Sequence, residues 1–293
     1  MSLAAESPIP AIKGRSLAED AWRRLSRNRA AVAGMAVLGL LILAATFGPL
    51  LAPYAYDQVN KADVWVPPLS GRHLLGTDAL GRDLLARLLT GLRVSLAIGF
   101  IATLVSLVIG VAWGAVAGYI GGALDEVMMR IVDVLYALPF IFFVILLMVT
   151  FGSNIILIFV AIGAVEWLTM SRIVRGQTQT LKHKEFIEAA RAAGLGQGAI
   201  IVRHIVPNLL GPVVVYVTLT IPAVILAESF LSFLGLGVQP PMASLGALIS
   251  GGANDMELAP WLLIFPSLTM IATLMAFNFV GDGLRDAIDP RDR

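Results

Sequence analysis

The sequence predicts an all-α protein, a polytopic membrane helix bundle with about six transmembrane helices. Two observations predict this fold class. Hydrophobic residues make up 58% of the 293 residues and charged residues only 14%, whereas charged residues make up about 25% of an ordinary soluble domain. The ionisable residues are also segregated, and five stretches contain no Asp, Glu, Lys, Arg or His: residues 30–56, 94–124, 134–165, 205–227 and 258–281. Each stretch reaches the roughly 20 apolar residues that a membrane-spanning helix needs, which excludes a water-soluble enzyme.

The residue inventory excludes several kinds of site. There is no cysteine, so disulfides, thiolate metal sites and cysteine nucleophiles are excluded. The three histidines, His73, His183 and His204, lie outside the apolar stretches and far apart in sequence, hence we expect no metal site. No Lys follows a Gly, so the phosphate-binding pattern GxxxxGKS/T is absent. The net charge of +1 gives no reason to expect a nucleic-acid partner.

The first two spans are placed by their apolar runs and by the residues that end them. We expect the first span at Ala31–Leu51, because Pro53 follows it. We expect the second span at Ser95–Ile120, because Gly121-Gly122 ends the run.

The stretch from 134 to 171 is too long for one span. It carries one charge, Glu166, and as a single helix it would be about 57 Å long, far more than the roughly 30 Å of the hydrocarbon core. We therefore divide it at Gly152-Ser153-Asn154 into a third and a fourth span. The fifth span is expected at Leu209–Leu234 and the sixth at Pro260–Val280, with a loop between them because residues 235–258 are rich in Gly and Pro.

Basic residues predict the orientation. If the N-terminus is inside, 16 of the 21 Lys and Arg residues lie on the cytoplasmic side, so both termini are expected in the cytoplasm. The chain then divides into a cytoplasmic N-terminal segment (1–29), a first transmembrane helix with an outer interfacial segment (30–93), a transmembrane core (94–281) that contains the loop 172–208, and a cytoplasmic tail (282–293).

Two further patterns belong to the second span and the residues before it. Asp78–Arg93 is amphipathic, and its residues Asp83 and Arg87 are spaced to pair. This stretch either lies in the outer interface of the membrane or extends the second span, and both alternatives stay open. Within the span, small residues recur every four positions, which lets helix backbones approach closely: Ala102, Ser106, Gly110, Gly114 and Gly118.

A few ionisable residues lie in or beside the spans. Glu228, near the outer end of the fifth span, belongs either to an outer gate or binding contact, or to a packed or solvated helix end. Glu166, toward the inner end of the fourth span, either has only a structural role or pairs with a basic residue, such as Arg172 or one of another subunit. A short inner loop before the third span is expected to hold an ion pair between one arginine and one of two aspartates: Asp125, Arg130 and Asp133.

The loop 172–208 is the longest polar stretch between spans, yet it is patterned. Its middle predicts a short helix with a small apolar face at i, i+3, i+4 and i+7: Phe186, Ala189, Ala190 and Ala193. Gly194 is placed to end this helix in the left-handed conformation. A second short helix is expected over Ala199–His204, ended by Pro207. Such a hairpin suits docking into a groove of a soluble partner; the alternative is a hairpin with no partner.

The same loop resembles the EAA loop of bacterial ABC importer permeases. Glu188-Ala189-Ala190 is followed after three residues by Gly194 and, thirteen residues later, by Pro207. His204 and Val206 depart from the Ile and Leu of the general pattern, but the residues around them resemble the peptide-transporter branch. Three further blocks resemble that branch: Leu75–Asp83, Glu228–Gly237 and Gly281–Pro290. Together the blocks are most similar to the C-type permease subunit of oligopeptide importers.

The resemblance implies a type I ABC importer permease fold and ATP-driven uptake of oligopeptides across the bacterial inner membrane. It implies a sister permease, two ATP-binding subunits, an extracytoplasmic peptide-binding protein and the lipid bilayer as partners. This chain would be non-catalytic and would hold no cofactor, because ATP and Mg²⁺ are bound by the ATPase subunits. The residues expected to couple the permease to an ATPase are Glu188, Ala189, Ala190, Gly194, His204 and Pro207.

Other functions differ from this one in substrate or in mechanism. Uptake of dipeptides, glutathione or nickel would use the same mechanism. A self-contained secondary transporter is disfavoured, because no repeat relates residues 30–171 to 205–281 and no charge cluster lies within a span. An intramembrane hydrolase needs a nucleophile with a base at membrane depth, and no His lies in a predicted span.

Overall fold

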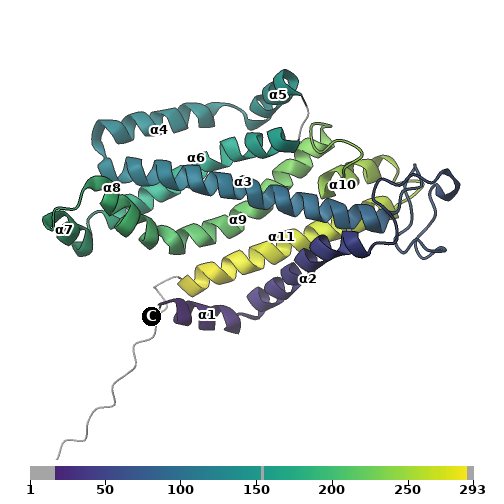
Figure 1. Ribbon diagram of the computed structural model, residues 1–293, viewed down its shortest axis with the longest axis horizontal. Helices are drawn as coiled ribbons and strands as arrows, with labels where there is room; N and C mark the ends of the chain where they lie inside the picture. Colours follow the sequence, from purple (N-terminus) through teal and green to yellow (C-terminus); the bar gives the residue numbers. More distant parts are fainter. Residues whose placement is uncertain (1–16, 153–154, 289–293) are drawn as a thin grey trace, which may run out of the picture.

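The computed structural model describes residues 17–152 and 155–288 as an elongated bundle of helices (Figure 1). Within these residues every regular element is helical, and the elements are α1 (Leu17–Arg27), α2 (Arg29–Leu51), η1 (Lys61–Asp63), α3 (Leu84–Ile120), α4 (Gly122–Ala137), α5 (Phe140–Phe151), α6 (Ile155–Leu181), α7 (Glu185–Ala192), α8 (Gln197–Ile200), η2 (Ile201–Ile205), α9 (Val206–Phe233), α10 (Leu245–Asn254) and α11 (Trp261–Ile288). The predicted division at Ser153-Asn154, the first part of the N-terminal segment and the end of the tail lie outside the described residues.

Five helices are long and apolar enough to cross a membrane: Arg29–Leu51, Leu84–Ile120, Ile156–Leu181, Gln197–Phe233 and Trp261–Ile288. The pair α4 and α5 supplies a sixth crossing if it counts as one broken span, since the two helices meet at a bend of 83°. The break falls at Leu138-Pro139, because proline lacks a backbone N–H and disfavours helical conformation in the residue before it. The predicted all-α bundle with about six spans is confirmed for the described residues.

The helix α3 lies at the centre and packs against α2, α6 and α9. Its small-residue stripe forms the contact with α6. A Cβ added to Gly114 would lie 2.4 Å from the carbonyl oxygen of Ser171, and one added to Gly110 would lie 2.5 Å from the side chain of Met170. The two helices therefore touch backbone to backbone, as the spacing predicts.

The amphipathic stretch Asp78–Arg93 extends the second span rather than forming a separate interfacial helix. α3 begins directly after Asp83, whose carboxylate caps the helix. The predicted pair between Asp83 and Arg87 is wrong. The Asp83 carboxylate lies 2.8 Å from Nδ1 of buried His73, while Arg87 lies 3.5 Å from the carboxylate of Asp78. Both oxygens of the Asp83 carboxylate are engaged, Oδ1 by the backbone N–H of Ala86 at 2.9 Å and Oδ2 by His73, so neither is left for Arg87.

The predicted inner loop before the third span is wrong, because residues 122–137 form the helix α4. Asp125, Arg130 and Asp133 therefore lie on helical turns. Charged residues at the end of an apolar run favour a loop when they face water alone. Here α6 supplies partners for the two aspartates, as described below.

The predicted loop 235–258 contains a further helix, α10, which packs against α9 and α11. Its glycines permit this close packing. A Cβ added to Gly246 would lie 2.3 Å from Cα of Ser229 in α9, and one added to Gly252 would lie 2.3 Å from the carbonyl oxygen of Leu262 in α11. The glycine content that suggested a loop instead marks two sites of close backbone approach.

The two ends of the bundle differ in structure. Figure 1 shows α7 and α8 at one end, and the segment 52–83 with α10 toward the other. The loop 172–208 and the segment that precedes α3 therefore lie at opposite ends of the spanning helices.

Candidate functional site

The helix α7 has the local structure that its sequence predicts. It starts after Lys184, carries Glu185 and Glu188 in its first turn and Arg191 in its last, which is the favourable order for the helix dipole. Gly194 has φ +80°, and its N–H donates to the carbonyl of Arg191 at 2.9 Å. The next N–H, of Leu195, donates to the carbonyl of Ala190 at 3.2 Å. These two bonds end the helix with a left-handed residue, the conformation that glycine adopts most easily.

The two faces of α7 have different surroundings. Ile187 and Ala190 are buried and belong to a core that also includes Ile200, Ile205 and Tyr119. Glu188, Ala189, Ala193 and Gly194 are exposed, and so is Phe186. Of the four residues of the expected apolar face, Phe186, Ala189 and Ala193 are thus exposed and only Ala190 is buried. The side of α7 that faces the bundle is the side that carries Ile187.

Side-chain contacts tie the loop to the end of α3. The Arg191 Nε donates to the hydroxyl of Tyr119 at 3.2 Å, and its guanidinium lies 5.2 Å from the centre of the Tyr119 ring. The Lys182 Nζ donates to the carbonyl of Gly118 at 3.2 Å. A displacement of α7 must therefore act on both α3 and α6. None of these contacts was predicted, since each joins residues more than sixty positions apart.

The predicted stop at Pro207 is wrong. The second half of the loop runs without interruption into α9, so that Gln197–Phe233 forms one helix. A π-helical turn over Ile201–Ile205 precedes the proline, and the N–H of Val206 donates to the carbonyl of Ile201. In this wider turn the backbone N–H bonds to the carbonyl five residues earlier instead of four. The change comes directly before Pro207, which has no N–H to donate. His204, on this turn, is half-buried, and Pro207, at the start of α9, is exposed.

Glu228 is fully buried and joins three helices. The Ser232 hydroxyl donates to its Oε1 at 2.6 Å, and the Ser95 hydroxyl of α3 lies 3.4 Å from its Oε2. The same Ser95 oxygen accepts a hydrogen bond from the backbone N–H of Leu245 at 3.0 Å, at the start of α10. The carboxylate therefore lies inside the bundle, where it links α9 to α3 and, through Ser95, to the start of α10.

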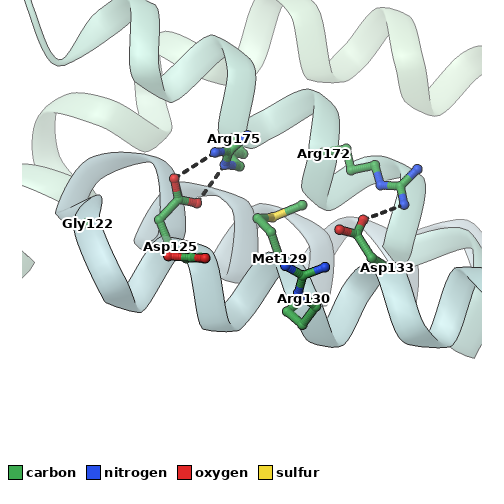
Figure 2. Close-up of a pocket in the computed structure, with 8 residues that line it drawn as sticks. Gly122, Asp125, Met129, Arg130, Asp133, Arg172 and Arg175 are labelled. Atoms are coloured by element: carbon green, nitrogen blue, oxygen red, sulfur yellow. Dashed lines mark hydrogen bonds and ion pairs between the residues drawn. The ribbon is translucent and has the colours of Figure 1, made fainter.

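A polar groove lies between α4 and α6 (Figure 2), with a volume of about 500 Å³. Asp125 accepts two hydrogen bonds from Arg175, at 2.6 and 2.7 Å, and Asp133 accepts one from Arg172 at 2.9 Å. The predicted pairing of Arg130 with either aspartate is wrong, because both carboxylates turn to arginines of α6. The predicted pairing of Glu166 with Arg172 is not formed for the same reason.

The segment 52–83 is held by a buried histidine. The ring of His73 stacks on Tyr54 with 4.7 Å between ring centroids, and its Nε2 lies 3.5 Å from Asp63. Within residues 17–152 and 155–288, no group of three or more His, Asp or Glu side chains could hold a metal ion. The sequence pattern gave no sign of this histidine contact, because its partners are ten residues away on either side.

Two family patterns match the chain. The pattern described as the binding-protein-dependent transport system inner membrane component matches residues 110–293. The pattern described as the N-terminal TM domain of oligopeptide transport permease C matches residues 16–68. The first covers the loop 172–208, the last part of α3 and the described elements from α4 to α11.

Curated relatives match almost the whole chain. The oligopeptide transport system permease protein OppC of Escherichia coli K12 is 56% identical over 283 residues, which cover 96% of this chain and 94% of the relative. That of Haemophilus influenzae is 52% identical over 287 residues, covering 96% of this chain and 91% of the relative. The dipeptide transport system permease protein DppC of Bacillus subtilis is 45% identical over 279 residues, covering 95% and 87%. The resemblance seen in the sequence is confirmed, and the chain is a multi-pass inner-membrane protein that belongs to the family of inner membrane components of binding-protein-dependent transport systems.

Proposed function

We propose that this chain is the permease subunit of an ATP-driven ABC importer for oligopeptides. One observation carries the proposal: α7 lies at the end of the bundle with Glu188, Ala189 and Gly194 exposed, while Ile187 and Ala190 anchor it to the long helices. A helix that is exposed on one face and firmly packed on the other is suited to receive force from a soluble partner. Small exposed residues allow that partner to approach closely.

The partners follow from this role. Two ATP-binding subunits dock at the loop 172–208 and supply ATP and Mg²⁺, a sister permease completes the path through the membrane, and an extracytoplasmic protein delivers the peptide. The chain itself is non-catalytic and binds no cofactor. Both of its termini lie in the cytoplasm, as the distribution of Lys and Arg supports.

Within the loop, the exposed residues Glu188, Ala189 and Gly194 meet the ATPase directly. Ala190 acts from beneath, because it is buried and sets the distance between α7 and the bundle. His204 lies on the π-helical turn and Pro207 follows it at the start of α9, so they set the direction in which a movement of α7 enters the fifth span.

At the opposite end, Glu228 contributes to an outer gate by holding α10 to α9 and α3. Its two serine contacts, from Ser232 and Ser95, come from different helices. A gate that opens at this end must separate or rotate helices that this carboxylate joins. The carboxylate thus stabilises one arrangement of the three helices over others.

Oligopeptides are the favoured substrate, since the relatives of highest identity given above carry that name and the N-terminal pattern is that of oligopeptide transport permease C. Dipeptide uptake is the second candidate, favoured by the 45% identity to the dipeptide permease of Bacillus subtilis. Both substrates use the same coupling.

The test is a pull-down of the tagged chain in mild detergent, with mass spectrometry of the proteins that accompany it, together with uptake assays. Wild type should carry a second permease and P-loop ATPases, and uptake should require ATP rather than a proton gradient. Gly194→Asp should lose or uncouple the ATPases. Gly71→Asp is the matched control, because Gly71 also has a positive φ and open space around it but lies at the other end of the bundle. A wild-type chain that is stably alone would refute the proposal.

A further inference from the structure

Glu166 carries a carboxylate at membrane depth in the span Ile156–Leu181. It comes ten residues, or about 15 Å of helix, after Ile156. Arg172, the next charged residue of the chain, follows about 9 Å further along the helix. Because the hydrocarbon core is roughly 30 Å thick, Glu166 lies in the part of α6 that this core surrounds.

The Glu166 carboxylate has no hydrogen-bond or ion-pair partner within the part of the chain that the structure describes. Arg172, the nearest arginine along α6, is engaged elsewhere. It donates to Asp133 at 2.9 Å, and its guanidinium lies over the ring of Tyr136, 4.3 Å from the centroid. Glu166 is half-buried, whereas Glu228 is enclosed by the bundle and hydrogen-bonded there. The open side of the Glu166 side chain therefore faces something outside this chain.

The surface around Glu166 is formed by α6 and α9, which pack against each other. The hydroxyl of Tyr216 in α9 lies close enough to interact with the Glu166 carboxylate, and Thr169, one turn after Glu166, lies beside the same hydroxyl. Tyr216 and Thr169 are half-buried, as are Val165 and Ile173 of α6 next to them. We call Glu166, Thr169 and Tyr216 the α6–α9 polar patch. It is a small polar area with apolar side chains beside it.

Hydrocarbon is a poor cover for this patch, because charged side chains at membrane depth face protein or a water-filled cavity. A surface that suits lipid is seen on α5, where the exposed residues Phe142, Leu146 and Val149 are all apolar. A water-filled cavity favours polar side chains over a wide area, whereas Val165 and Ile173 flank the patch. Contacts between membrane helices have the observed composition: they are mostly apolar and use single polar side chains that hydrogen-bond across the interface.

We propose that the α6–α9 polar patch is a contact surface for the sister permease, which supplies a basic side chain to Glu166. The inference rests on the proposed function, which places a second permease beside this chain. Of the protein partners that this function requires, the sister permease is the one that lies within the bilayer. A basic partner complements the negative charge, and hydrogen bonds between two charged groups are roughly twice as strong as those between neutral groups.

The first experiment identifies the molecule that touches the patch. A photoreactive benzoylphenylalanine is placed at Thr169 of the complete transporter in its membrane, and mass spectrometry identifies the crosslinked product. The product should contain the sister permease. The control places the same group at Val149 of α5, which is 77% exposed and should crosslink to lipid. A crosslink from Thr169 to lipid, or to a transported peptide, would show that the inference is wrong and leave the proposed function standing.

The second experiment measures how fast the sister permease dissociates from the purified complex in detergent. Glu166→Leu suits a lipid surface but removes the acceptor, so dissociation should be about three- to tenfold faster, as expected for the loss of a polar contact between membrane helices. Glu166→Gln keeps an acceptor and should show a smaller change. Glu126→Leu, which removes an exposed acid of α4 outside the patch, is the matched control and should dissociate at the wild-type rate.

Thermal unfolding of Glu166→Leu separates the loss of a subunit contact from the loss of the fold, and it should match that of wild type. Wild-type dissociation of Glu166→Leu would overturn the inference, since a lipid-facing residue would behave in this way. If the wild-type chain carries no second permease at all, the proposed function fails together with the inference.

Discussion

The carboxylate of Asp125 in α4 accepts two hydrogen bonds from the guanidinium of Arg175 in α6, at 2.6 and 2.7 Å. This two-point contact fixes the start of α4 against the helix that leads into α7. Asp125 is buried, with 7% of its surface exposed, so these hydrogen bonds replace contacts with water.

Replacing Arg175 should therefore destabilise the protein more than an ordinary surface substitution. Arg175→Gln leaves a buried carboxylate with a weaker partner, and we expect a loss of about 1–3 kcal/mol, because the arginine itself is partly exposed. The double variant Asp125→Asn with Arg175→Gln should recover part of the loss. Thermal unfolding in detergent measures both.

The neighbouring pair gives the control for that experiment. Arg172 and Asp133 are 40% and 55% exposed in their side chains, so Arg172→Gln should cost less than about 1 kcal/mol. Equal losses for the two arginines would contradict the assigned difference in burial.

Substitutions at two adjacent alanines of α7 should have different effects. Ala189 is exposed, so Ala189→Trp should leave folding intact and reduce ATP-driven uptake about tenfold or more by blocking the partner. Ala190 is buried, so Ala190→Leu should overpack the core beneath α7 and cost about 1–3 kcal/mol. Uptake and thermal unfolding are measured for both variants. A stable Ala190→Leu protein with wild-type uptake would show that α7 does not pack as described.

The contact between α3 and α6 can be tested at one glycine. Gly114→Ala places a methyl group 2.4 Å from the carbonyl of Ser171, and the helices must separate, at a cost of about 1–3 kcal/mol. Gly176→Ala, also in the α3–α6 pair but with open space around it, should instead gain up to about 1 kcal/mol of helix propensity. Opposite signs for the two unfolding shifts are the expected result, and a neutral Gly114→Ala would be inconsistent with the packing.

The buried carboxylate of α9 should be needed to hold α10. Glu228→Gln keeps the size of the side chain and one hydrogen-bond acceptor, and should change stability little. Glu228→Ala leaves the hydroxyls of Ser95 and Ser232 without this acceptor and opens a cavity, so a loss of about 2–3 kcal/mol is expected. Hydrogen exchange of the α10 amides should accelerate in Glu228→Ala only. Unchanged exchange would mean that α10 is held by its glycine contacts alone.

The orientation of the chain can be measured directly because it contains no cysteine. A cysteine introduced at Ser26 should react with a membrane-impermeant maleimide only in inverted vesicles, and one at Gly71 only in right-side-out vesicles. Labelling of both from the same side would contradict the orientation given by the basic residues.

Much of the fold can be predicted because charge-free runs of this length have few alternatives in a membrane. The positions of α2, α3, α9 and α11 follow from them. The end of α7 at Gly194 was also predictable, since a left-handed glycine after a short helix is a local signal. What was mispredicted depends on distant contacts. The charged residues of α4 indicated a loop because the partners of its two aspartates, Arg172 and Arg175, lie on α6 and are distant in the sequence.

The rest of the candidate site escaped prediction for similar reasons. The rule that a proline ends a helix considers only neighbouring residues. It does not predict the π-helical turn before Pro207, after which the helix continues. A glycine-rich segment gives no sign of whether its glycines bend the chain or let two helices touch, and Gly246 and Gly252 do the latter. The apolar spacing of α7 identified its small residues, but not which of them would face the bundle, because that depended on Ile187.

The uninterrupted course of Gln197–Phe233 has a mechanical consequence. This single helix of 37 residues is about 55 Å long. Near one end, Ile200 and Ile205 belong to the core that also contains Ile187 and Ala190 of α7. Near the other end, Glu228 contacts Ser95, which accepts a hydrogen bond from the first residue of α10. The π-helical turn at Ile201–Ile205 and the prolines Pro212 and Pro222 are the points at which this helix can bend. A movement of α7 can therefore reach the neighbourhood of α10 along one continuous piece of backbone, and these bending points set how much of it is transmitted.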